Sequence, residues 1–180
     1  MADKKISALT AATTPLAGTE VLPIVQNGST VKVSVSNLST FGPAFSASLS
    51  GTQTITSGTT TKLQFNTEQF DTNSNYDNAT NYRFTPTVAG YYQINVVLDF
   101  ADVSTGAQDI LARLYKNGSQ YLAPVRIHTG AGAEWGVTIS QLVYMNGSTD
   151  YLEVFFQVVA ATNCAVYAGS NFNGSLVRSA

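Results

Sequence analysis

Residues 65–100, FNTEQFDTNSNYDNATNYRFTPTVAGYYQINVVLDF, contain the pattern that decides the fold of this chain. Between residues 92 and 100 apolar side chains occupy every second position, and most of the positions between them are polar. A period of two is that of a β-strand with one buried face, and it does not suit a helix. Pro86 has no N–H to donate to a strand ladder, and Gly90 can adopt a positive φ. We therefore predict that residues 85–90 form a connection that leads into a long core strand.

The same segment and the end of the chain carry motifs of a known family. The motifs are Tyr76-Asp77, Phe84-Thr85-Pro86, Gly90-Tyr91-Tyr92 and, in a closing strand, Phe172, Gly174 and Leu176-Val177. Over residues 45–177 this pattern resembles the globular head of complement component one, subcomponent q, and the tumour-necrosis-factor ligands. The resemblance implies an all-β protein with a ten-stranded jelly-roll β-sandwich that assembles as a homotrimer, with core or trimer contacts by Tyr76, Phe84, Tyr92, Phe156 and Phe172. Two positions depart from the family pattern: Tyr82 stands where glycine is usual, and Ile94 stands where an aromatic residue is expected.

The composition limits the classes of function. The chain of 180 residues is long enough for one well-buried domain and a small appendage. Only 11% of the residues are charged and the net charge is −2, so the sequence offers no electrostatic footprint for nucleic acid. Cys164 is the only cysteine, which excludes an intrachain disulfide and predicts a thiol packed in a strand as a small apolar group. No secretion signal or membrane-spanning run is recognised, so we expect synthesis in a cytoplasm without signal-directed export or membrane insertion.

The first 40 residues differ from the rest of the sequence. VLPIVQ (21–26) and STVKVSV (29–35) flank Asn27-Gly28, the strongest short-range signal for a hairpin. Ile6-Ser7-Ala8-Leu9, residues 15–20 and 23–26, Val33-Ser34-Val35 and Leu38 resemble the N-terminal attachment segment of tailed-phage fibre and virion proteins. The resemblance implies an anchor at residues 1–40 and a separate head at residues 41–180. We expect the hairpin to dock on a capsid or tail protein. It could add its strand to a sheet edge, or it could pack apolar side chains into a groove, namely those of Val21, Ile24, Val31, Val33 and Val35.

Strand signals recur along the head with turn residues between them, as a β-sandwich requires. Strands are predicted at residues 44–50, 52–56, 62–66, 82–85, 91–99, 110–116, 120–125, 137–145, 151–159, 164–168 and 171–178. The Asn-Gly pairs at 117–118 and 146–147 lie where hairpin turns are needed. Residues 151–159 carry apolar or aromatic groups on both faces, which is typical of a strand between a core and a subunit interface or of a two-faced core strand.

The sequence offers little for catalysis. A transition-metal site within one subunit is not expected, because His128 is the only histidine and Cys164 the only cysteine, although a threefold His128 site on a trimer axis stays open. No paired carboxylates of a glycan-cleaving enzyme can be placed at a working distance. We predict a protein that is not an enzyme and needs no cofactor or metal. One oxygen-rich cluster could bind Ca²⁺ or form hydrogen bonds within its own turns; it consists of Asp71, Asn73, Asn75, Asp77, Asn78 and Asn81. The turn role is favoured, because the spacing of these residues is not that of an EF-hand.

Binding is the role we expect of the head. Segments 101–109 and 128–136 are predicted to be apical loops, and Trp135 lies in a glycine-rich stretch, although a core or subunit-interface position for this residue is also open. The residues of these loops that could contact a receptor are Asp102, Thr105, His128, Glu134 and Trp135. We therefore expect a bacteriophage virion protein, a short trimeric fibre or head-fibre exposed on the particle, whose head binds a host surface glycan or protein. Two alternatives stay open: a capsid decoration or cement protein without receptor binding, and a secreted recognition protein of the complement or cytokine type.

Overall fold

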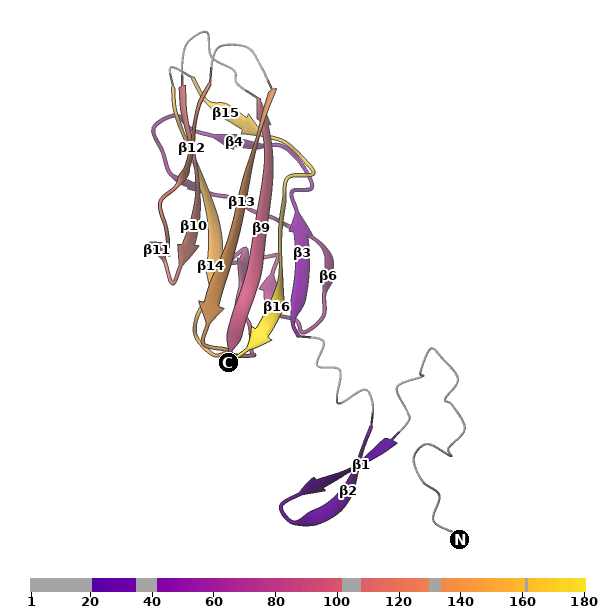
Figure 1. The fold of residues 1–180 in the computed structure, drawn as a ribbon. Helices are drawn as coiled ribbons and strands as arrows, with labels where there is room; N and C mark the ends of the chain where they lie inside the picture. Colours follow the sequence, from indigo (N-terminus) through magenta and orange to yellow (C-terminus); the bar gives the residue numbers. More distant parts are fainter. Residues whose placement is uncertain (1–20, 35–41, 102–107, 130–133, 161) are drawn as a thin grey trace. The chain divides into compact units, whose positions relative to one another are not determined.

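The computed structural model describes residues 21–34, 42–101, 108–129, 134–160 and 162–180. The chain divides into two compact units, Met1–Phe41 and Gly42–Ala180. All regular secondary structure in the described ranges is β-strand (Figure 1). The sequence-based expectation of an all-β protein is confirmed.

The described part of the first unit is a two-stranded hairpin. Strand β1 (Val21–Gln26) pairs antiparallel with β2 (Ser29–Ser34), with Gln26 opposite Ser29. The two turn residues, Asn27 with φ 51° and Gly28 with φ 77°, both lie in the left-handed region that a type I′ turn requires. The Asn-Gly signal therefore predicted both the turn and the register.

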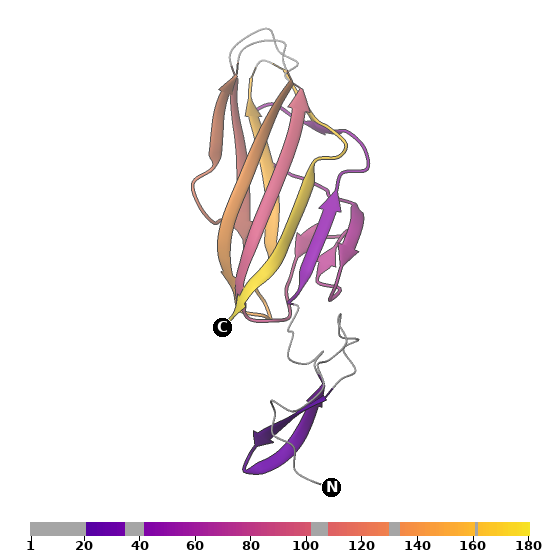
Figure 2. The same cartoon turned by 45° about the vertical axis from the view of Figure 1, so that its right-hand side comes forward.

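The second unit is a sandwich of two antiparallel sheets (Figures 1 and 2). We name each sheet after a central strand. The β14 sheet contains, in spatial order, β11 (Ser119–Gln120), β10 (Gln108–Lys116), β14 (Leu152–Val159), β8 (Arg83–Phe84) and β7 (Tyr76–Asp77), with β12 (Val125–Thr129) paired to β10 and β5 (Thr61–Lys62) paired to β14. The β9 sheet contains β4 (Gln53–Ile55), β15 (Cys164–Val166), β9 (Gly90–Ala101), β16 (Asn171–Ser179), β3 (Ala44–Ser48) and β6 (Thr67–Asp71), with β13 (Glu134–Met145) paired to β9.

The core lies between the two sheets. Inward-facing residues alternate along the central strands as predicted, and those on β9 and β14 are completely buried: Tyr92, Ile94, Val96, Leu98 and Phe100 on β9, and Leu152, Val154, Phe156 and Val158 on β14. Cys164 is also buried, and its thiol donates a hydrogen bond of 3.1 Å to the carbonyl of Ala101. The cysteine therefore packs as a small apolar group, as its neighbours in the sequence indicate.

Two predicted strands differ from those observed. Residues 120–125 do not form one strand, because Pro124 cannot donate to a ladder; β11 ends at Gln120 and β12 begins after the proline. Of the predicted strand at residues 62–66 only Lys62 lies in a strand, β5, although Leu63 and Phe65 are buried in the core. Strand β6, the next strand in the chain, was not predicted, because its residues show no alternating pattern; it forms by pairing with β3.

Two glycines have roles other than those predicted. Gly90 has no positive φ; a side chain there would place Cβ 2.4 Å from the carbonyl oxygen of Arg178, so glycine permits a close approach of β9 and β16. The Asn146-Gly147 pair is not a hairpin turn, because β13 and β14 belong to different sheets. The pair lies in the crossing between the sheets, where the side-chain oxygen of Asn146 accepts bonds from three backbone N–H groups, those of Ser148, Thr149 and Asp150.

Candidate subunit interface and binding surfaces

Exposed apolar side chains gather on the outer face of the β9 sheet. Outward positions alternate with the buried ones along each strand, because successive side chains point to opposite faces. Four such residues lie at the end of the sheet where β9 begins and β13 and β16 end. They are Tyr91 (43% exposed), Leu142 (54%), Tyr144 (42%) and Val177 (62%), and we name them the apolar patch.

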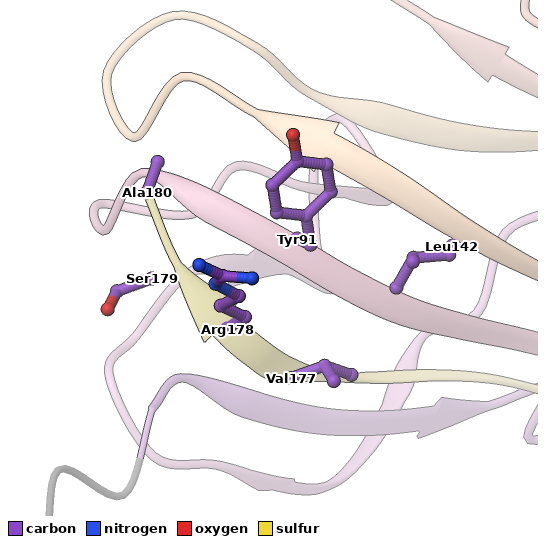
Figure 3. A pocket seen from close by; sticks show the side chains of 6 residues that line it. All are labelled: Tyr91, Leu142, Val177, Arg178, Ser179 and Ala180. Atoms are coloured by element: carbon purple, nitrogen blue, oxygen red, sulfur yellow. The ribbon is translucent and has the colours of Figure 1, made fainter.

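The strands bring the patch together from three distant parts of the sequence (Figure 3). Tyr91 on β9 lies directly opposite Tyr144 on β13, and their ring centroids are 5.4 Å apart. Tyr91, Leu142 and Val177 also line an open pocket of about 530 Å³, together with Arg178 and the last two residues, Ser179 and Ala180. Figure 3 shows the Tyr91 ring and the Leu142, Val177 and Arg178 side chains around this hollow.

The rows of this face nearest to the patch are mainly polar and almost without charge, whereas exposed Asp99 on β9 and Glu134 on β13 lie at the other end of the sheet. The strand registers align four rows across the sheet: Tyr144, Tyr91 and Arg178; Leu142, Gln93, Ser175 and Ala44; Ser140, Asn95, Asn173 and Ser46; and Thr138, Val97, Asn171 and Ser48. Arg178 is the only side chain of these rows that is charged at neutral pH. Hydrogen bonds link the amides and hydroxyls across the strands, from Gln93 to Ser140, from Ser140 to Asn95 and from Asn95 to Asn173.

On the outer face of the β14 sheet, side chains contact one another instead of leaving an apolar patch. Lys62 and Glu153 form an ion pair of 2.5 Å, and Glu153 is only 5% exposed. The rings of Tyr115 and Phe155 are 4.1 Å apart between their centroids. The two outer faces therefore differ, since the β9 sheet leaves apolar groups open to a partner. The centres of protein interfaces are depleted of charged residues and enriched in aromatic ones, as this face is.

The five residues of the predicted core or trimer motif are all buried within the single chain. Tyr76, Phe84 and Phe172 pack around the ring of Phe45, with centroid distances of 5.1, 4.2 and 4.8 Å. Tyr92 joins this cluster through Phe84 at 5.4 Å, whereas Phe156 lies apart and contacts Phe100 at 5.2 Å. Burial raises the pKa of Tyr76 and raises that of Tyr92 to about 12. None of the five reaches the outer face.

The predicted receptor-contact residues do not form one loop. Asp102 and Thr105 lie outside the described residues. The other three lie in strands, His128 in β12 and Glu134 and Trp135 in β13, so their placement in loops was wrong. The strands are longer than predicted because Gln108 pairs with Thr129 and Ala101 pairs with Glu134.

Two of these residues have partners on neighbouring strands. The Nδ1 atom of His128 lies 3.1 Å from a carboxylate oxygen of Asp109. Trp135 is directly opposite the buried Phe100, so it continues the inward row of β13 to the open end of the sandwich, where it remains 37% exposed. Trp135 is therefore not part of the buried core, and the core alternative for this residue is not confirmed.

The register divides the predicted docking residues of the hairpin between its two faces. Ile24 is opposite Val31 and Leu22 is opposite Val33, so these four residues share one face, with Leu22 46% exposed. Val21 lies on the other face, and Val35 lies outside the described residues. Sequence reasoning missed Leu22, although counting outward from the Asn-Gly turn would have placed it opposite Val33.

The oxygen-rich cluster at residues 71–81 stabilises turns. Asp71 accepts a bond of 2.6 Å from the backbone N–H of Tyr76. The carboxylate of Asp77 accepts bonds from the backbone of Thr80, Ala79 and Asn81, and these bonds lower its pKa to about 2. Across the ranges that the structure describes, no group of three or more His, Cys, Asp or Glu side chains could hold a metal ion. The same ranges contain no helix that is long and apolar enough to cross a membrane.

The fold of the second unit is that of the complement-type jelly-roll heads. The globular domain of zebrafish complement 1qA protein superposes with a TM-score of 0.50 at 18% identity, over 77% of this chain and 99% of that chain. PRD1 vertex protein P5 superposes with a TM-score of 0.51 at 17% identity, over 77% and 99% of the two chains. The Eiger tumour-necrosis factor of S. frugiperda gives a TM-score of 0.48 at 9% identity, over 78% and 94%. No protein-family model and no curated protein matches the sequence.

Proposed function

We propose that this chain is a structural protein of a bacteriophage virion and acts by binding rather than catalysis. Three copies of the jelly-roll head form a homotrimer, the N-terminal 40 residues dock on a capsid or tail protein, and the head projects to bind the host surface. The apolar patch on the outer face of the β9 sheet is the observation that carries the trimer. Its position beside strand rows in which Arg178 is the only charged side chain suits an interface between copies of the chain.

Burial of the patch contributes part of the free energy of association. Its four side chains are 42% to 62% exposed. Burying the remaining surface of each contributes roughly 1 kcal/mol, so the patch supplies on the order of 4 kcal/mol per subunit before the entropy of association is subtracted. Beside the patch, the amide of Gln93 and the hydroxyl of Ser140 add hydrogen-bonding groups that can fix the orientation of the partner.

The hairpin supports the docking role. An isolated two-stranded hairpin is marginally stable in water, and this one exposes Leu22, Ile24 and Val31 on a single face. That face can be buried against a groove or a partner sheet on the particle. Three hairpins per trimer would multiply weak contacts through their effective concentration.

Resemblance and fold support the virion role. Residues 1–40 resemble the attachment segments of phage virion proteins. The head has a fold that PRD1 vertex protein P5 also uses, as does a complement globular domain. A binding head on a short anchor is the simplest arrangement that uses both units.

Light scattering of the purified protein tests the trimer. We expect the full-length chain to have three times the mass of one chain, and Leu142→Lys to reduce it to a monomer because the lysine places a charge in the patch. Leu122→Lys is the matched control, since Leu122 is 45% exposed and lies between β11 and β12, away from the patch. A monomeric wild-type protein, or a trimeric Leu142→Lys variant, would contradict this interface.

Binding to particles lacking the protein tests the anchor. We expect a truncated protein that begins at Phe41 and the variant Ile24→Asp to lose particle binding. Val25→Asp is the matched control, because Val25 is 74% exposed on the opposite face of the hairpin. The truncated head should still bind host cells. Trimers that bind particles but never cells would instead identify a decoration protein without receptor binding.

A further inference from the structure

A shallow groove lies on the outer face of the β9 sheet, over strands β16, β3 and β6. It has a volume of about 410 Å³. It is lined by residues of β3, β6 and β16 and by Gly169, which lies two residues before β16: Ser46, Ser48, Gln69, Gly169, Asn171 and Asn173. None of these six residues carries a charge, so the groove does not select for an ionic ligand.

A β-bulge places an aromatic ring beside this groove. The pairing of β3 with β6 shifts between Ser46 and Ala47, so that Gln69 is the extra residue of β6. Phe70 is directly opposite Ser46 and therefore lies on the same outer face, where it is 50% exposed. Bulges redirect side chains at sheet edges, and here the bulge brings the amide of Gln69 and the ring of Phe70 to one face.

The polar groups of the groove keep unused hydrogen-bonding capacity. Gln69 accepts a bond from Ser46 and donates one of 2.6 Å to Ser48. Asn173 donates one of 3.0 Å to the side-chain oxygen of Asn171. A primary amide has two N–H groups and two lone pairs, so Gln69 and Asn173 each keep a donor. The amide nitrogen of Asn171 has no partner among the residues that the structure describes.

We propose that this groove binds a neutral oligosaccharide. A sugar ring offers an apolar face of C–H groups that can pack on Phe70, and an edge of hydroxyls that both donate and accept hydrogen bonds, as the amides and serines here do. The groove supplies the convergent polar groups of a small-ligand site, and Phe70 supplies the aromatic surface that such sites also need. This proposal names the class of ligand for the proposed host binding. It rests on the proposed function only in placing that ligand on a host surface.

Binding of the full-length protein to immobilised oligosaccharides tests the groove. Titration calorimetry then measures the affinity of those that bind. The neutral panel contains oligomers of glucose, galactose, mannose and N-acetylglucosamine, and sialylated and uronic acid oligomers form the acidic comparison. We expect wild-type protein to bind at least one neutral oligomer. Phe70→Ala should weaken that binding at least tenfold, whereas Phe70→Tyr should retain it. Val159→Ala is the control, since Val159 is 49% exposed on the β14 sheet.

Light scattering and thermal unfolding of each variant separate the outcomes. The proposal is overturned if folded wild-type protein binds no neutral oligomer, if it binds only acidic ones, or if Phe70→Ala binds as tightly as wild type. It is also overturned if Phe70→Ala changes the oligomeric state, because the groove then belongs to the subunit interface. If the protein binds host cells but no neutral oligosaccharide, the groove proposal is rejected and the proposed function stands. If it binds a neutral oligosaccharide but no host cells, the groove proposal stands and the proposed host binding is rejected.

Discussion

Tyr82 is held in a backbone conformation that its side chain disfavours. Its φ is 50°, in the left-handed region, and it is the only bulky residue among the non-glycine residues with positive φ that the structure describes; the others are Asn27, Ser74 and Asn117. An L-residue pays roughly 1–2 kcal/mol there, which glycine avoids. Glycine in turn costs about 0.5–1 kcal/mol through the greater freedom of the unfolded chain. We therefore expect Tyr82→Gly to be more stable than Tyr82→Ala by about 0.5–1 kcal/mol.

Comparison with alanine isolates the backbone effect, because both variants lose the tyrosine ring and only alanine keeps a Cβ atom. For a domain of this size the difference corresponds to roughly 2–4 °C in Tm. Thermal unfolding followed by circular dichroism, with both variants at equal chain concentration, measures it. Tyr82→Asn should lie between the two, since asparagine tolerates the left-handed region. If Tyr82→Ala unfolds at the same temperature as Tyr82→Gly or above it, the strain assigned to this position does not exist.

Three further predictions concern stability and reactivity. Phe172 is fully buried and its ring lies within 5.9 Å of those of Phe45, Phe65 and Tyr76, so Phe172→Ala should lower the free energy of unfolding by about 3–5 kcal/mol, measured by urea denaturation. The pKa of Asp77 is lowered to about 2 by hydrogen bonds from Thr80 and its neighbours, so its carboxylate stabilises the fold above the unfolded pKa near 4 and loses that effect as the pH falls towards 2. The stability difference between wild type and Asp77→Ala should therefore be constant above about pH 5 and shrink below pH 4; a difference independent of pH would refute the role of these bonds. Cys164 is 1% exposed, so a thiol reagent should modify it only as the protein unfolds, and rapid modification of the native protein would contradict its burial.

Local sequence patterns determined the elements whose signal needs no distant partner. The period of two at residues 92–100 and 152–158 predicted β9 and β14 and their buried faces, because alternation follows directly from the geometry of a strand. The Asn-Gly pairs at 27–28 and 117–118 predicted two hairpin turns, because asparagine and glycine accept the positive φ that such turns need. The family motifs predicted the sandwich, which the structure confirms.

Only the tertiary structure decided features that depend on pairing between distant segments. The Asn-Gly pair at 146–147 has the same local signal as the other two, yet it crosses between sheets because β13 pairs with β9 and not with β14. The strand pairings also set the apolar patch, since Tyr91, Leu142 and Val177 come together only when β9, β13 and β16 lie side by side. The groove likewise depends on the bulge in β6, which no periodicity marks. A sequence specifies which face each strand buries, but it is the order of strands in the sheet that determines which exposed side chains become neighbours.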